Sequence, residues 1–169
     1  RRPRSRAGLA GRVRQHGLRG VFFVEALFSY AAGMDPLKRV VSRLLEGGHE
    51  VGLHLHPEWL RRAPHVSVLP GKEGNLMRRF SEDDQATLIA RGIEQLQKAG
   101  VPQVDSFRAG GYAANFDTLR ALARNGVLYD SSHNFCWFGQ TCDLRTDEPL
   151  LQPRQIDGVY EFPVSYFQD

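Results

Sequence analysis

Three histidines and two glutamates lie within the twelve-residue stretch GHEVGLHLHPEW, residues 48–59. His54 and His56 alternate with leucines, and side chains two positions apart in a β-strand point to the same side. Two such imidazoles can converge on one divalent ion, with bonds of about 2.0–2.1 Å for zinc. Glu58 continues the alternation beyond Pro57, as a third ligand or as the acceptor that fixes an imidazole tautomer. The spacing therefore predicts a metal site with His54, His56 and Glu58 as ligands.

A plainer interpretation makes His54 and His56 hydrogen-bonded surface residues of an edge strand, with Trp59 as packing. His49 is an odd number of residues away from His54 and His56, so its side chain would point to the other face of the strand, which indicates a structural role. Two imidazoles on one face, followed by a proline that ends strand pairing, favour the metal site. The pair lacks the fixed spacing of a zinc finger or an HExxH motif and supplies only two ligands.

The elements that must position these side chains alternate between strands and helices. Apolar, β-branched and aromatic runs predict strands at residues 20–28, 49–56, 104–111, 127–132 and 158–165. Helical spacing with cap and stop residues predicts helices at residues 5–16, 35–48, 81–100 and 115–126. Long loops are expected over 61–80 and 133–155, and Cys136 and Cys142 in the second could form a disulfide or remain thiols.

Such alternation is typical of βαβ units around a parallel sheet or barrel, with functional residues at the carboxyl ends of the strands. Arg108 and Asp130 follow two later strands, so they would share one rim with the histidines. The alternative for Arg108 is a surface ion pair. For Asp130 it is a turn residue that caps Ser131 and Ser132.

Composition bounds the class of protein. With 169 residues, 41% hydrophobic and 24% charged, the chain fits one globular domain over residues 1–169. No apolar run approaches the roughly 20 residues that cross a bilayer. The net charge of +3 comes largely from residues 1–19, which lack a nucleic-acid reading motif, so nucleic acid is not an expected partner. Because the chain does not begin with Met, a fragment is one interpretation, and a soluble, cytoplasmic protein is expected unless a signal lies upstream.

The order of several segments resembles that of a known family. GVFFVEALF, GHEVGLHLHPEW, DSFRAGGYAAN, GVLYDSS and VYEFPVS follow one another as in the polysaccharide deacetylases, the NodB-homology or carbohydrate esterase family 4 domains. The resemblance runs from about Gly20 to Phe162. It implies an α/β fold, a distorted (β/α) barrel, with a divalent ion, usually zinc, held by one Asp and two His. It also implies a hydrolase of carbon–nitrogen bonds that removes N-acetyl groups from sugars of a polysaccharide or glycan precursor.

The resemblance assigns roles to particular residues. His54 matches the first histidine of the family's H-[ST]-x-x-H motif, while the second would fall at Glu58, two residues after His56. Arg108 matches the arginine that orients the catalytic base. Asp130 aligns with the acidic residue that tunes the general-acid histidine.

The turn after Arg108 departs from the family, because RAGG has Gly110 in place of a proline. Backbone N–H groups at Gly111 or Tyr112 can still bind a developing oxyanion. Trp59 and Tyr112 are further substrate-binding candidates, since their rings can stack on sugars.

Two parts of the family pattern are not found. The first strand normally ends in an Asp-Asp pair, which nothing before Gly20 matches, and the general-acid histidine would lie beyond residue 169. The expected fold is therefore a NodB-like barrel lacking its first strand and C-terminal part. A non-catalytic glycan-binding or scaffold domain of the same fold is the rival hypothesis, and another metal-dependent hydrolase of linear amides is a third. The sugar, the metal and the oligomeric state stay open.

Overall fold

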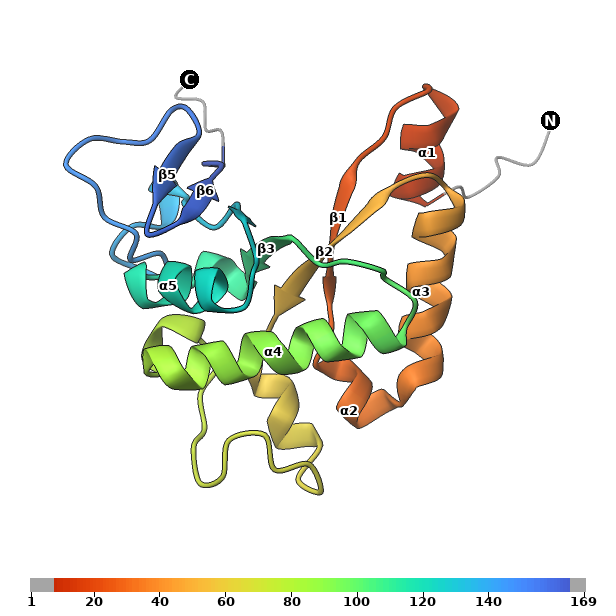
Figure 1. Cartoon of the computed structure of the whole chain (residues 1–169), viewed down its shortest axis with the longest axis horizontal. Helices are drawn as coiled ribbons and strands as arrows, with labels where there is room; N and C mark the ends of the chain where they lie inside the picture. The colour runs from red at the N-terminus through yellow and green to blue at the C-terminus, as the bar shows by residue number, and fades with distance from the viewer. Residues whose placement is uncertain (1–7, 165–169) are drawn as a thin grey trace.

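A computed structural model describes residues 8–164 (Figure 1). One sheet contains the strands β1 (Val21–Glu25), β2 (Glu50–Leu55), β3 (Ser106–Ala109), β4 (Tyr129–Asp130), β5 (Arg154–Ile156) and β6 (Val159–Glu161). The α-helices are α1 (Leu9–Gln15), α2 (Phe28–Ala32), α3 (Met34–Glu46), α4 (Glu82–Lys98) and α5 (Phe116–Arg124). Short 3₁₀ helices are η1 (Pro57–Arg62), η2 (Met77–Arg79), η3 (Gly110–Tyr112) and η4 (Phe135–Trp137).

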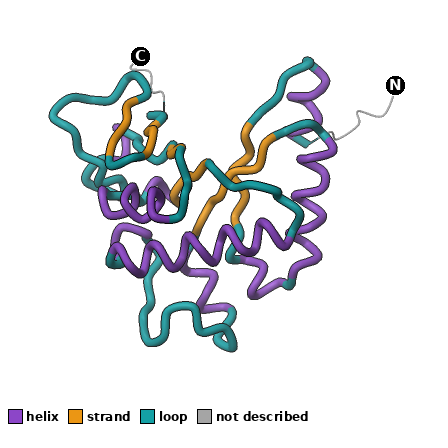
Figure 2. The backbone as a smooth tube through the Cα atoms, viewed as in Figure 1, coloured by secondary structure: helices purple, strands orange, loops and turns teal. Residues whose placement is uncertain are grey.

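The sheet has the order β1-β2-β3-β4-β6-β5, and all neighbours are parallel except the β5–β6 hairpin. Parallel strands that follow one another in chain order, joined by right-handed crossovers, place every crossover helix on the same face. Contacts of α4 with both α3 and α5 agree with one helical layer (Figure 2). The predicted (β/α)-barrel type of α/β fold is confirmed.

The side-chain alternation of β2 separates core from site. Leu53 and Leu55 are buried and face α4, where a Cβ on Gly92 would lie 2.8 Å from a methyl carbon of each. Glycine therefore lets the helix approach the strand closely. Burial of each leucine contributes about 1.5–3 kcal/mol. Because both leucines point to the helices, His54 between them points to the opposite face of the sheet.

Helices α4 and α5 begin at the predicted caps. The Ser81 side chain accepts a hydrogen bond from the backbone N–H of Asp84. The Asn115 side chain accepts from the N–H of Thr118, whose hydroxyl accepts in return from the N–H of Asn115. This reciprocal box satisfies two of the N–H groups that a helix start leaves without partners.

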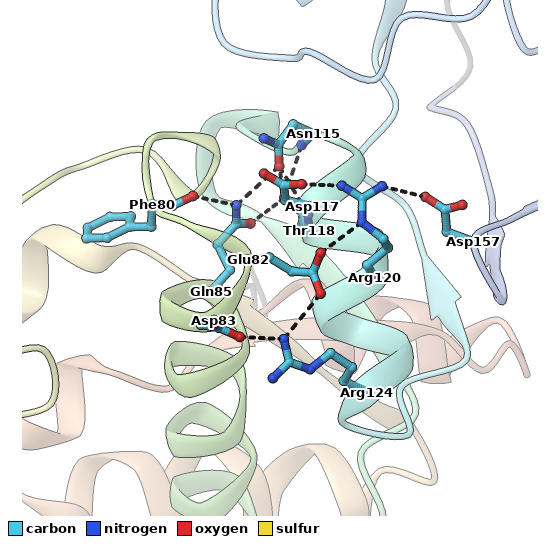
Figure 3. Close-up of polar contacts among 10 residues, drawn as sticks. All are labelled: Phe80, Glu82, Asp83, Gln85, Asn115, Asp117, Thr118, Arg120, Arg124 and Asp157. Carbon is cyan, nitrogen blue, oxygen red and sulfur yellow. Dashed lines mark hydrogen bonds and ion pairs between the residues drawn. The ribbon is translucent and has the colours of Figure 1, made fainter.

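An ion-pair network joins α4, α5 and the β5–β6 turn on the surface (Figure 3). Arg120 of α5 binds carboxylates from three elements, those of Glu82, Asp117 and Asp157. Arg124, one turn further along α5, shares Glu82 at 3.2 Å. The network therefore holds the hairpin end of the sheet against the helical layer.

Two expectations about local structure were wrong. The apolar run at 20–28 was taken as one strand, but β1 ends at Glu25 and the chain turns into α2. The two regions predicted as loop are not only loop, because 61–80 holds the end of η1 and all of η2, and 133–155 holds η4 and most of β5. The Asp157-Gly158 turn, with φ of 48° and 86°, closes the hairpin, and this dipeptide is a turn signal that the sequence offered.

The last predicted strand is shorter than expected, ending at Glu161, and its final residue Ser165 lies outside the described residues, as do residues 5–7 of the first predicted helix. Cys136 is exposed and Cys142 buried, and both are free thiols. Within residues 8–164, no helix is both long and apolar enough to cross a membrane.

Candidate functional site

Three polar side chains form a row across the carboxyl ends of the first three strands. Glu25 pairs with His54 in the β1–β2 register, and His54 pairs with Arg108 in the β2–β3 register. Residues paired across parallel strands project from the same face of the sheet. All three therefore lie on the face opposite the helices. The structure thus brings together two predicted site residues and one that the sequence reasoning missed.

His54 is held in one orientation. Its Nδ1 lies 2.6 Å from the carbonyl oxygen of Arg108, so Nδ1 carries the proton and donates it. Burial lowers the pKa of His54, and the nearby charge of Arg108 acts in the same direction. The ring is therefore neutral at pH 7, and no hydrogen bond within residues 8–164 engages its Nε2.

His56 lies beside His54, with the two ring centroids 4.9 Å apart. Its Nδ1 is 3.1 Å from Oε1 of Glu58, a carboxylate contact of the kind that fixes a histidine tautomer. Within the described part of the chain, Nε2 of this ring also has no partner. A Cβ on Gly110 would lie 2.8 Å from two carbons of this ring, so only glycine leaves the imidazole its place. Glu58 therefore contacts the ring from the side away from Nε2, and its predicted role as a metal ligand stays a prediction.

The two imidazoles of His54 and His56 are suited to bind a divalent ion, but the described residues do not complete the ligand set. Metal-bound histidines usually donate the other ring N–H to a carbonyl or carboxylate, which is the arrangement of both rings here. The buried Oε2 atoms of Glu25 and Glu58 have no hydrogen-bond partner. Among residues 8–164, however, no three His, Cys, Asp or Glu side chains are arranged to hold a metal ion. The described residues supply a two-imidazole site without an assembled third ligand.

Glu25 is the site residue that the sequence reasoning missed. Its Oε1 accepts a hydrogen bond from the backbone N–H of Leu27 at 2.8 Å, while Oε2 is buried without a partner. The pKa of Glu25 is raised to about 8, mainly by burial and also by the charge of Glu58, against the opposing effect of backbone N–H groups. The signal in the sequence was a single carboxylate inside the apolar run 20–28, and the strand register places it level with His54 and Arg108.

Arg108 is half-buried on the same face. Its Nε donates to the Ser131 carbonyl oxygen at 2.9 Å and its Nη2 to the Ser131 hydroxyl at 2.6 Å. The guanidinium carbon lies 4.6 Å from the ring centroid of Phe23 and 5.9 Å from that of Tyr112. No carboxylate within residues 8–164 lies within 4.0 Å of it, so the surface ion pair considered as an alternative is not formed there.

The turn that follows β3 is strained. Gly111 and Tyr112 have φ of 59° and 57°, and the left-handed conformation is uncommon for a bulky residue such as tyrosine. Thr141 donates its hydroxyl hydrogen to the Gly111 carbonyl at 2.5 Å and so fixes the turn. Strain of this kind clusters at functional sites, where surrounding structure maintains it.

Trp59 lies on η1, with its ring centroid 6.2 Å from that of Phe28 on α2. The guanidinium carbon of Arg62 is 4.7 Å from its indole. The first contact packs η1 against α2, and the second lies within η1.

Asp130 lies on the other face of the sheet from His54 and Arg108. It pairs with buried Phe107 on β3 and with Glu161 on β6, and both carboxyl groups are inaccessible to solvent. Burial raises both pKa values, that of Glu161 to about 11, and one buried oxygen of each carboxyl, Oδ2 of Asp130 and Oε2 of Glu161, has no hydrogen-bond partner among the described residues. Asp130 therefore reaches the site only indirectly, because it accepts from the Ser132 hydroxyl, which itself accepts from the N–H of Ala109.

His49 has the structural role predicted for it. It is buried, its Nδ1 accepts from the N–H of Gly20 at 3.3 Å, and its Nε2 donates to the Ala10 carbonyl at 3.1 Å. The ring also packs edge-on against Phe22. It thereby ties α1 and the start of β1 to β2, away from the imidazole pair.

Two cavities of similar size flank these elements. One, of about 390 Å³, lies between η1 and the long loop before η2. The other, of about 380 Å³, lies on the open face of the sheet and is lined in part by Phe23, Ser131, Tyr129 and Phe162. The second adjoins Arg108, because Phe23 and Ser131 are also contacts of that guanidinium.

Two solved structures share this arrangement of elements. One is assigned as a polysaccharide deacetylase from Mycobacterium smegmatis, with a TM-score of 0.57 at 24% identity over 93% of this chain and 44% of that one. The chain has the fold of the polysaccharide deacetylases. The other is a family 4 carbohydrate esterase from Streptomyces lividans in complex with acetate, with a TM-score of 0.51 at 19% identity over 72% of this chain and 52% of that one.

No family profile matches the sequence, and no curated protein sequence matches it either. The chain spans about half the length of the two solved structures.

Proposed function

We propose that the protein is a metal-dependent deacetylase that removes N-acetyl groups from sugars of a polysaccharide or glycan precursor. The observation that carries this proposal is the His54–His56 pair, whose Nδ1 atoms are engaged and whose Nε2 atoms are free, at the strand ends of a deacetylase fold. The alternative, two hydrogen-bonded surface histidines of an edge strand, requires β2 at an edge of the sheet, whereas β2 lies between β1 and β3.

The chain's own residues would prepare the site for a divalent ion, with zinc as the first candidate. His54 and His56 would hold it through Nε2, since the Arg108 carbonyl and Glu58 keep the protons on Nδ1. When bound, such an ion polarises an amide carbonyl and lowers the pKa of a water molecule. Because burial keeps His54 neutral, its lone pair is available at pH 7 without loss of a proton.

Two further features would serve amide hydrolysis. The Oε2 atom of Glu25 is buried and unpaired beside His54, and because its pKa is about 8 this carboxyl is mostly protonated at pH 7. It would therefore donate a proton as a general acid, and would accept one from water only in its minor ionised form. The backbone N–H groups at Gly111 and Tyr112 would face the oxyanion, in a turn whose strained geometry is already fixed. Arg108 would orient groups at the rim between them.

The test combines metal content with acetate release. We expect stoichiometric zinc in purified protein, and its loss from His54→Ala and His56→Ala, while exposed His16→Ala retains it. Glu58→Gln should weaken zinc binding by about 10–100-fold, as is usual for the acceptor behind a ligand. Zinc that survives both histidine changes would remove the assignment. Acetate release from N-acetylated chito-oligosaccharides, abolished by the same two changes, tests the activity.

A non-catalytic glycan-binding domain is the second candidate. It is favoured by one observation, that the described residues do not assemble three metal ligands. Exposed aromatic side chains on the open sheet face, including Tyr129 and Phe162, would then stack on sugar rings. Sugar binding that is unchanged by a chelator, together with no acetate release, would favour this function.

A further inference from the structure

The arginine-rich segment at the start of the chain takes no part in the proposed catalytic site. Residues 1–19 contain seven arginines and no acidic residue, while the rest of the chain has 15 basic against 19 acidic residues. In the described part of this segment, Arg12, Arg14 and Arg19 are exposed, and none of them forms an ion pair with a residue of 8–164. The positive charge is therefore concentrated in one region, and no carboxylate of the described residues neutralises it.

Two leucines share this region with the arginines. Leu9 and Leu18 are each 62% exposed. Leu9 lies three residues before Arg12 in α1, and residues three apart in a helix project from the same face. We call the five residues Leu9, Arg12, Arg14, Leu18 and Arg19 the α1 surface. It combines uncompensated positive charge with apolar side chains that lie in water.

The fold holds the α1 surface in place. Helix α1 ends in a Schellman motif, in which the N–H of Gly17 donates to the Arg14 carbonyl and the N–H of Leu18 to the Val13 carbonyl. Gly17 supplies the left-handed backbone, with φ of 69°, that this ending requires. Near the start of the helix, the buried imidazole of His49 donates to a carbonyl oxygen of α1 at 3.1 Å. Binding through this surface would therefore cost little ordering entropy.

The α1 surface lies at the end of the sheet opposite the imidazole pair (Figure 1). The segment leads into the first residue of β1, Val21, whereas His54 pairs with the last residue, Glu25. At about 3.3 Å per residue, these two ends of the strand are about 13 Å apart. A large partner on the α1 surface would therefore leave the imidazole pair uncovered.

We propose that the α1 surface binds the headgroup region of a membrane that contains anionic lipids. Such a membrane attracts arginines near its surface, and the boundary between its headgroups and acyl chains accepts apolar side chains. The exposed leucines favour lipid over nucleic acid, and residues 1–19 contain no Phe, Tyr or Trp to stack on bases. This inference is independent of the proposed deacetylase function, because none of the five residues belongs to that site.

Co-sedimentation of the 169-residue chain with lipid vesicles tests the proposal. The vesicles consist of phosphatidylcholine, either alone or with about 30% phosphatidylglycerol as the anionic lipid. We expect binding to the anionic vesicles to be at least about 10-fold tighter than to the neutral ones at about 0.1 M NaCl. Most of this difference should disappear at about 0.5 M NaCl, because salt screens exposed charges.

Two sets of variants separate the charges from the leucines. Arg12→Gln, Arg14→Gln and Arg19→Gln in one chain should weaken binding to anionic vesicles by about 100-fold, since each arginine near such a surface contributes about fivefold. Leu9→Ser with Leu18→Ser should weaken it by at least about 10-fold, because less apolar surface leaves water on binding. The matched control removes the same charge from three exposed arginines elsewhere and should retain the affinity. These three are changed to glutamine at Arg61, Arg79 and Arg154.

Equal binding to neutral and anionic vesicles would overturn the proposal. Equal losses in the triple arginine variant and its matched control would do the same, because the position of the charges would then not matter. Duplex DNA is the competing partner: tighter binding to DNA than to anionic vesicles, unchanged by the two leucine substitutions, would overturn the assignment to lipid. All substitutions are at exposed positions, and circular dichroism verifies the fold of each variant. Because no step measures acetate release, failure of the proposed function leaves this result unaffected.

Discussion

Replacing Glu161 by glutamine should stabilise the protein at neutral pH. Glu161 is completely buried beside Asp130, and its pKa is raised from 4.5 to about 11 by burial and by the Asp130 charge. Between pH 4.5 and about 11, the carboxyl of Glu161 is therefore protonated in the folded protein and ionised in the unfolded chain. In Glu161→Gln the amide oxygen can still accept from the N–H of His133, and the amide N–H can donate to Asp130.

The size of the effect follows from the two pKa values. A raised carboxyl pKa contributes stability that is complete below the unfolded value of 4.5 and is lost as pH rises towards 11. At pH 7 the chain is 2.5 pH units above 4.5, at about 1.4 kcal/mol per unit, so the variant should be more stable by about 3 kcal/mol. The difference should vanish near pH 4 and grow further at pH 8.

Urea unfolding followed by tryptophan fluorescence at pH 4, 6, 7 and 8 measures this difference. Glu148→Gln, at an exposed position, is the matched control and should follow the unmodified protein at every pH. A variant that is no more stable at pH 7, or a difference that does not depend on pH, would refute the argument that Glu161 is buried in its protonated form. Glu161→Ala should instead destabilise at all pH values, because it leaves Asp130 buried without its partner.

Glu25→Gln should also stabilise the fold, because burial raises the pKa of this carboxyl too, and the gain should develop between pH 4.5 and about 8. The same urea titration measures the gain, and a difference that continues to grow well above pH 8 would contradict the prediction. Gly110→Ala should weaken zinc binding, because its Cβ would lie 2.6 Å from the Leu55 carbonyl oxygen and would displace the imidazole of His56. In the control Gly8→Ala, the added Cβ meets nothing within 4 Å, so the zinc affinity should not change. Arg120→Ala should lower the melting temperature at low salt and less so in 1 M NaCl, and equal loss at both would show that the ion pairs are not its cause.

Much of the architecture followed from local patterns. Caps at Ser81 and Asn115 and the apolar spacing after them marked α4 and α5 almost to the residue, because capping hydrogen bonds are local. The β5–β6 hairpin was missed even though the Asp157-Gly158 signal was present, since the flanking strands have only three residues each. Short edge strands are stabilised by their neighbours more than by their own residues.

For the site, the sequence determined that two imidazoles share a face, because the period of two in a strand is a property of the backbone. The sequence also predicted that Arg108 and Asp130 lie at the carboxyl ends of two later strands. Only the tertiary structure decided that Asp130 faces away from that pair and towards Glu161, since β4 enters the sheet in a register that pairs it with Phe107. The position of Glu25 beside His54 was likewise decided by register between strands 29 residues apart, a relation that no local pattern encodes.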